Sequence, residues 1–271
     1  MSPGEAAVLF AAATAAGGMN ALAGGGTILT FPVLLLLGES AITANATSTV
    51  ALLPGAAASL LGYRREVQTH RKWLSTLIVP SLLGGAAGSM LLLFTPENLF
   101  AGLAPWLILF ATLLFFLQSF SRFRARFTAR HREPREEAAP VGPAAADAPG
   151  SRQSLRFAWF AQLAVAIYGG YFGAGIGILM LVVLGTLGLE NIHAMNGLKN
   201  FFGMCINGVA AAIFLLSGRV NGPAALVMLA GAILGGFIGA NFGRSIGQAK
   251  ARGAVIGIGL LLTILLWWQQ P

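Results

Sequence analysis

Charged residues are scarce in this 271-residue chain: they make up 10% of it, with 9 acidic residues against 17 lysines and arginines. Cysteine occurs once, as Cys205, which excludes an intrachain disulfide. The three histidines form no cluster with it, and the chain has no CxxC pair of the kind that binds zinc. We therefore expect neither a metal site nor a cofactor.

Apolar residues, in contrast, make up 56% of the chain, and the mean hydropathy is +0.76. Several apolar runs approach the roughly 20 residues that a helix needs to cross a bilayer. This pattern predicts an all-α integral membrane protein that crosses the lipid bilayer several times. The net charge of +8 comes from short basic clusters between these runs. Such clusters orient membrane helices, so we expect no nucleic-acid partner.

The first apolar stretch, residues 6–37, is too long for one helix across about 30 Å of hydrocarbon and too short for two full crossings. Gly24, Gly25 and Gly26 interrupt it, and each glycine costs roughly 1 kcal/mol in a helix interior. Backbone freed by a break inside a membrane needs partners from protein, water or ligand. We predict a hairpin of two helices that is broken at these glycines.

The second half of the chain repeats the glycine pattern of the first. Gly169 lies 152 residues after Gly17, Gly175 lies 150 after Gly25, and the GGFIG run at Gly235 lies 151 after GGAAG at Gly84. Glycines at this spacing also permit close helix packing in membranes. The nearly constant offset nevertheless predicts an internal repeat, with each half holding a Gly-broken helical hairpin plus three spanning helices.

Loop charges predict how the two halves are oriented. Loops 62–72, 121–153 and 243–252 are basic and should be cytoplasmic, whereas 95–98 and 217–222 are not. The two repeats are then inverted relative to each other. We expect a first transmembrane repeat over residues 1–120, a basic and then Ala/Pro-rich disordered cytoplasmic linker over 121–153, and a second transmembrane repeat over 154–271.

Two broken hairpins in inverted repeats predict a binding site near the midplane, where half-helix N-termini favour anions. Lys199 is the only lysine or arginine in the sequence that lies well inside an apolar run. A lysine at the centre of a membrane helix costs about 2.5–3.5 kcal/mol. An anionic substrate would compensate for this cost. The alternative is that Lys199 snorkels to the interface or pairs with Glu190, fewer than ten residues away.

The candidate substrate-binding residues lie at the two breaks and at the starts of the helices that follow them. Asn196, Lys199 and Asn200 share one helical face, which Asn207 extends. In the first half, the matching polar cluster runs from Asn45 to Thr49, where helix capping and interhelical hydrogen bonds are an equally good explanation. The full set is Asn20, Gly24, Gly25, Gly26, Thr27, Asn45, Thr47, Ser48, Gly173, Gly175, Gly177, Asn196, Lys199 and Asn200.

Three segments resemble one known family: GGMNALAGGGTILTFPVLLLLGESAITANATST, its echo GGYFGAGIGILMLVVLGTLGLENIHAMNGLKN, and GYRR at 62–65. The chain resembles the sulfite exporter TauE/SafE family of membrane transporters, also called DUF81, over both halves and apart from the linker. This resemblance implies transport of small anions, often sulfur-containing ones such as sulfite or sulfonates, across the bacterial inner membrane.

Two other functions are compatible with part of this pattern. A passive anion channel would use the same basic pore residue without alternating access. An intramembrane enzyme would need an acid, base or nucleophile constellation, and the chain offers one isolated cysteine and no carboxylate within its apolar runs. We therefore expect a transporter of a small anionic substrate and not an enzyme.

Overall fold

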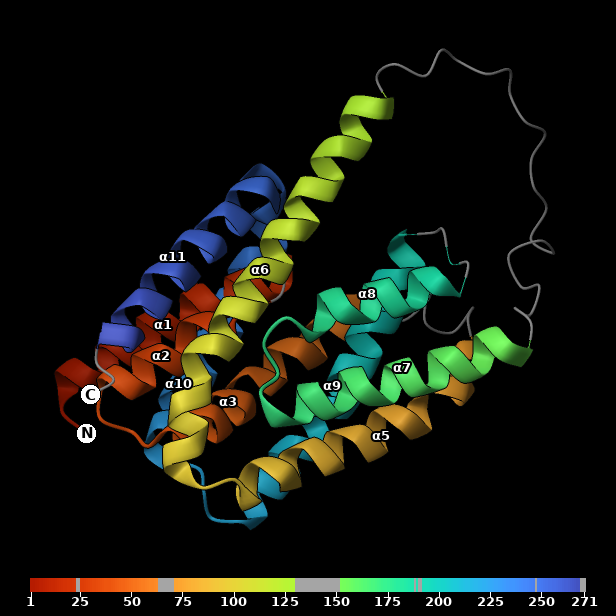
Figure 1. Ribbon diagram of the computed structural model, residues 1–271. Coiled ribbons are helices and arrows are strands. Elements are labelled where there is room, and N and C mark those ends of the chain that lie inside the picture. The colour runs from red at the N-terminus through yellow and green to blue at the C-terminus, as the bar shows by residue number, and fades with distance from the viewer. Residues whose placement is uncertain are drawn as a thin grey trace.

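A computed structural model describes residues 1–22, 25–62, 71–129, 152–187, 189, 192–246 and 248–268. Over these residues the fold is all-helical, with ten α-helices (Figure 1). The first half holds α1 (Pro3–Leu22), α2 (Thr27–Leu36), α3 (Ala41–Gly62), α5 (Arg71–Phe94) and α6 (Glu97–Ala129). The second half holds α7 (Arg152–Tyr171), α8 (Ile176–Thr186), α9 (Ile192–Leu216), α10 (Gly222–Ile246) and α11 (Gln248–Trp268).

Four of the described helices are long and apolar enough to cross a membrane. Their apolar segments are Trp73–Phe94, Glu97–Gln118, Ala194–Leu216 and Gly222–Gly239, from α5, α6, α9 and α10. The helix α3, which we also predicted to span, is 22 residues long but is not one of these four. Its first turns contain Thr43, Asn45, Thr47, Ser48 and Thr49, which lower its mean hydropathy.

Both apolar stretches break at the predicted glycines. Between α1 and α2 Gly25 has a φ of +89°, and between α7 and α8 Gly173 and Gly175 have φ values of +82° and +79°. This left-handed region favours glycine because it has no Cβ. The helices α2 and α8 that follow have 10 and 11 residues, so each is about 15–17 Å long. Each is therefore about half as long as the hydrocarbon layer is thick.

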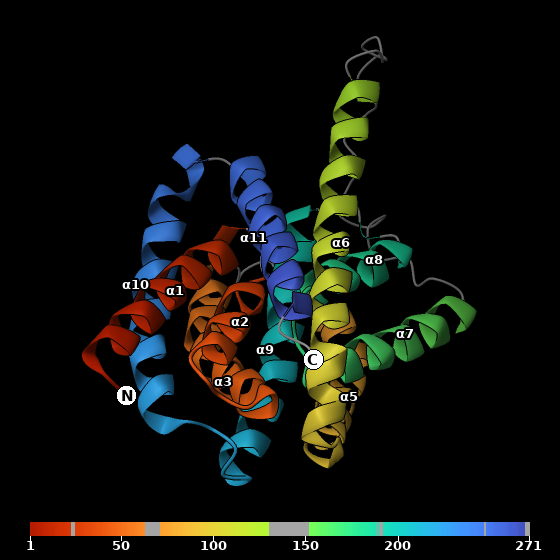
Figure 2. The same cartoon turned by 60° about the vertical axis from the view of Figure 1, so that its left-hand side comes forward.

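The two halves interlock instead of forming separate bundles. The helix α1 of the first half packs against α10 of the second (Figure 2), and α5 packs against α7 (Figure 1). Glycines permit this close approach: a Cβ at Gly235 of α10 would come closer than 3.0 Å to the Thr14 carbonyl oxygen of α1. A Cβ at Gly88 of α5 would meet the Ile167 carbonyl oxygen of α7 equally closely. The repeated glycine motifs thus pack the helices of one half against those of the other.

The helix α6 is longer than its apolar run. It continues to Ala129, through the first nine residues of the segment that we predicted as the linker, and extends beyond the other helices (Figure 2). The added segment, SRFRARFTA, contains no glycine or proline to stop a helix. Residues 130–151 of the predicted linker lie outside the described residues.

Candidate functional site

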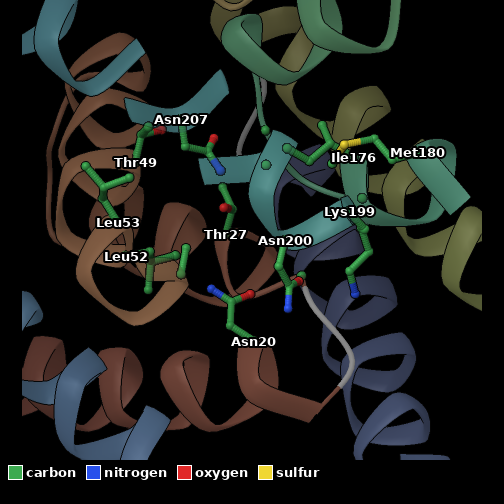
Figure 3. A pocket seen from close by; sticks show the side chains of 16 residues that line it. Asn20, Thr27, Thr49, Leu52, Leu53, Ile176, Met180, Lys199, Asn200 and Asn207 are labelled. Carbon is green, nitrogen blue, oxygen red and sulfur yellow. The ribbon is translucent and has the colours of Figure 1, made fainter. Parts of the chain in front are cut away.

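A cavity of about 120 Å³ lies where the two breaks meet α3 and α9 (Figure 3). A cavity of about 150 Å³ can hold a benzene-sized molecule, so this one suits a ligand of a few heavy atoms. Eight of the predicted site residues line it: Asn20, Gly25, Thr27, Gly173, Gly175, Gly177, Lys199 and Asn200. The structure thus brings residues from both halves of the chain to one place.

One side chain in this lining is formally charged, and it is positive. Lys199 of α9 is half-buried, and among the described lining residues none is acidic. Uncharged hydrogen-bonding groups accompany it, and Figure 3 shows them distributed around the cavity. They are the amides of Asn20, Asn200 and Asn207 and the hydroxyls of Thr27 and Thr49. The lining therefore combines one positive charge with neutral polar groups, as a site for a small anion requires.

Gly177 makes room for the Lys199 side chain. A Cβ placed on Gly177 would lie 3.3 Å from Lys199 Cδ, which is tighter than most van der Waals contacts. The lysine stem therefore packs over the first turn of α8. Because Gly175, Ile176 and Gly177 all line the cavity, the N-terminal end of α8 faces the same space. A helix N-terminus carries a partial positive charge, which adds to that of the lysine.

The first break is organised by Asn20, near the end of α1. Its side-chain oxygen accepts a hydrogen bond from the Gly26 N–H at 2.8 Å, just before α2 begins. A Cβ on Gly26 would collide with this amide and with the Ala16 carbonyl oxygen, so glycine is needed there. Asn20 also lines the cavity. It therefore both fixes the turn into α2 and presents its amide to the site.

Six predicted site residues are not part of the described lining. Asn45, Thr47 and Ser48 are fully buried and hold elements together. The Asn45 amide donates to the Tyr171 carbonyl at 3.0 Å, Thr47 Oγ1 accepts from the Asn221 N–H at 3.0 Å, and Ser48 is hydrogen-bonded to Thr30. Gly26 and Asn196 lie in described segments but outside the lining, and Gly24 lies outside the described residues.

The structure adds apolar residues that sequence reasoning did not select. They form part of the wall and are Leu52, Leu53, Ala56, Ile176, Met180 and Gly203. On α3 the lining positions are 49, 52, 53 and 56, which is the i, i+3, i+4, i+7 pattern of one helical face. This periodicity would have found the leucines once Thr49 was taken as a lining residue. Figure 3 shows that Leu52 and Leu53 lie across the cavity from Ile176 and Met180, so apolar side chains alternate with polar ones around the lining.

No group of three or more His, Cys, Asp or Glu side chains that could hold a metal ion occurs within the described part of the chain. Cys205 of α9 is half-buried and is a free thiol.

Comparison with known proteins gives a match over almost the entire chain. The family model described as "Sulfite exporter TauE/SafE" matches residues 9–266. The chain is 27% identical over 264 residues, 97% of its own length and 95% of the relative's, to a "Probable membrane transporter protein" of Haemophilus influenzae. It is 24% identical over 270 residues to "Probable membrane transporter protein YfcA" of Escherichia coli K12, covering 100% of this chain and 92% of the relative. No solved structure matches it.

The match extends through both broken hairpins and all the helices that line the cavity. The relatives are described as membrane transporters, and the spanning helices agree with that description. The chain is therefore a multi-pass membrane protein that belongs to the sulfite exporter TauE/SafE family, a family of membrane transporters and not of enzymes.

Proposed function

We propose that this protein transports small anions, in particular sulfur-containing ones such as sulfite or sulfonates, across the bacterial inner membrane. The cavity between the two broken hairpins is the binding site. The observation that carries this proposal is the lining: Lys199, three amides and two hydroxyls, with no acidic residue among the described lining positions. The family description supports the sulfur-containing class.

The energetic contributions of such a site are sufficient for selective but reversible binding. A hydrogen bond from a charged donor contributes about 1.5–3 kcal/mol. The N-terminal end of a helix contributes about 0.3–2 kcal/mol to an anion. Lys199 and the starts of α2 and α8 would act together on one ligand. A transported substrate must also dissociate, so a moderate affinity is what transport requires.

We further infer that residues 1–120 and 154–271 are inverted repeats, with the cavity on the axis that relates them. The packing of α1 on α10 has its counterpart in α5 on α7 (Figure 1). The lining positions also correspond: Thr49, Leu52 and Ala56 of α3 each lie 151 residues before Asn200, Gly203 and Asn207 of α9. A substrate site at the repeat interface is the arrangement that alternating access uses.

The orientation we propose places the linker in the cytoplasm and the end of α11 outside. The loops around Glu39, Glu97 and Asn221 are hydrogen-bonded together at one end of the molecule, and basic residues are few there. A reporter enzyme that works only outside the cytoplasm should be active when it is fused after Pro271, and one that works only in the cytoplasm should be inactive there. A fusion that is active only as a cytoplasmic reporter would contradict the inverted orientation.

Transport is tested by counterflow in vesicles of purified protein. Vesicles loaded with unlabelled sulfite should accumulate labelled sulfite transiently, because a carrier exchanges one substrate for another. A passive channel, the second candidate, would give only equilibration down the gradient. Sulfate, thiosulfate, sulfonates and carboxylates as internal anions would then rank the substrates. Absence of exchange with every one of these anions would contradict the proposed function.

A further inference from the structure

Three turns are joined by hydrogen bonds at the end of the molecule that we place outside. Glu97, at the start of α6, accepts a hydrogen bond from the Ile42 N–H at 3.1 Å and one from Ser40 Oγ at 3.2 Å. Asn221, before α10, donates from its side chain to Glu39, and its N–H donates to Thr47 Oγ1 at 3.0 Å. The turn after α2 is thus tied both to the α5–α6 turn and to the α9–α10 turn.

An aromatic cluster lies on the cavity side of these turns. Phe31 of α2, Phe100 of α6 and Phe172 after α7 are 0%, 0% and 1% exposed. Their ring centroids are 5.4–6.4 Å apart in edge-to-face pairs, and Tyr171 lies 5.5 Å from Phe100. We call Phe31, Phe100 and Phe172 the aromatic plug.

The plug lies between the turns and the cavity. Phe172 directly precedes Gly173, which lines the cavity, and Phe31 is one helical turn beyond the lining residue Thr27. Phe100 is one turn from Glu97, which belongs to the joined turns. On α3, residues 44–48 are buried and the lining begins at Thr49. Side chains of three helices and one break therefore fill the space between the cavity and this end.

We propose that the aromatic plug is the outer gate of the transport pathway and that the Glu39–Asn221 hydrogen bond is the latch that holds it closed. This inference rests on the proposed function, because the pathway that is gated is that of the transported anion. The structure then represents a state of the transporter that is closed toward the outside.

The physical character of the plug and of the latch supports these two different roles. The plug is apolar, so separating its rings breaks no hydrogen bond. The latch joins two turns in which Gly38 and Gly218 have φ values of +90° and +70°, close to Glu39 and Asn221 respectively. Both latch residues are half-buried, and water at the membrane surface can replace their hydrogen bonds. Opening would therefore move the turn after α2 away from the turn before α10.

The test uses a cysteine in the cavity as a reporter of access from outside. In a Cys205→Ser background, Thr49→Cys should react slowly with a membrane-impermeant thiol reagent added outside the cell. Adding Asn221→Ala removes the latch, together with the cap of α10 in which Asn221 Oδ1 accepts from the Ala224 N–H at 3.1 Å. It should speed this reaction about tenfold or more, because a hydrogen bond to a charged group shifts an equilibrium by that factor. The matched control is Asn98→Ala, at the same end, where the exposed side chain accepts from the neighbouring Leu99 N–H. Equal rates in the two alanine variants would overturn the latch.

A second variant keeps the test independent of stability. In the Cys205→Ser background, Glu39→Cys with Asn221→Cys places two thiols at the latch, which a short bifunctional methanethiosulfonate reagent can join without requiring disulfide geometry. Cross-linking should then stop anion exchange, and reductant, which releases the reagent, should restore it. Unchanged exchange in the fully cross-linked protein would overturn the gate.

The labelling assay requires no substrate, so it separates the two proposals. If Asn221→Ala accelerates labelling but no anion slows it, the gate stands and the anion site is wrong. If anions slow labelling but Asn221→Ala does not accelerate it, the anion site stands and the gate is wrong.

Discussion

Replacing Lys199 by methionine should weaken anion binding about tenfold to a hundredfold, equivalent to about 1.5–3 kcal/mol. Among the described residues of the cavity lining, Lys199 alone carries a formal charge. Methionine keeps most of the apolar stem that packs over Gly177 and removes the charge. Lys199→Arg should retain part of the affinity, because it keeps the charge but changes its geometry. The dissociation constant of the purified variants measures both effects.

The control for this substitution is Arg156→Met, at an exposed position of α7 and outside the cavity lining. It removes the same charge without touching the site, so its affinity should equal that of the unaltered protein. If Lys199→Met binds anions as tightly as this control does, Lys199 only snorkels to the interface. The site would then depend on the helix ends, amides and hydroxyls.

Replacing Gly235 by valine should cost about 3 kcal/mol or more and remove most of the folded protein. At this position α10 lies against the backbone of α1, and a Cβ would come closer than 3.0 Å to the Thr14 carbonyl oxygen. Backbone atoms cannot move aside as a flexible side chain can. The loss is measured as the thermal unfolding temperature and the monodisperse yield in detergent.

The neighbouring Gly236 provides a matched control, because a Cβ there would meet nothing within 4 Å. Gly236→Val has the same helix-propensity change as Gly235→Val and should be nearly neutral. Similar losses in both variants would show that valine is harmful in α10 for a reason other than packing against α1.

The backbone breaks and the charge of the site could be predicted from the sequence because both violate a strong rule. Consecutive glycines weaken a membrane helix, and Lys199 is costly within an apolar run. The broken hairpins explain the glycines, and the anion site that we propose would explain the lysine. The end of α6 at Ala129 could not be inferred from the basic charge of the segment after Phe120, because this segment has no glycine or proline that would terminate a helix.

The polar cluster of α3 shows what the sequence could not decide. Asn45, Ser48 and Thr49 lie within one stretch, yet only Thr49 lines the cavity. Asn45 and Ser48 are hydrogen-bonded to Tyr171 and Thr30, which come from α7 and α2. Polar residues stabilise helix contacts in membranes as readily as they bind substrates. Only the position of the neighbouring helices separates these roles.

The central claim is that one small anion binds in the cavity beside Lys199. Equilibrium binding of radiolabelled sulfite to the purified protein tests this claim most directly, with methanesulfonate and the neutral dimethyl sulfone as competitors. We predict saturable binding at one anion per chain that methanesulfonate displaces, that dimethyl sulfone does not, and that Lys199→Met weakens. Binding that the neutral sulfone displaces equally well, or that Lys199→Met leaves unchanged, would contradict a charged anion site in this cavity.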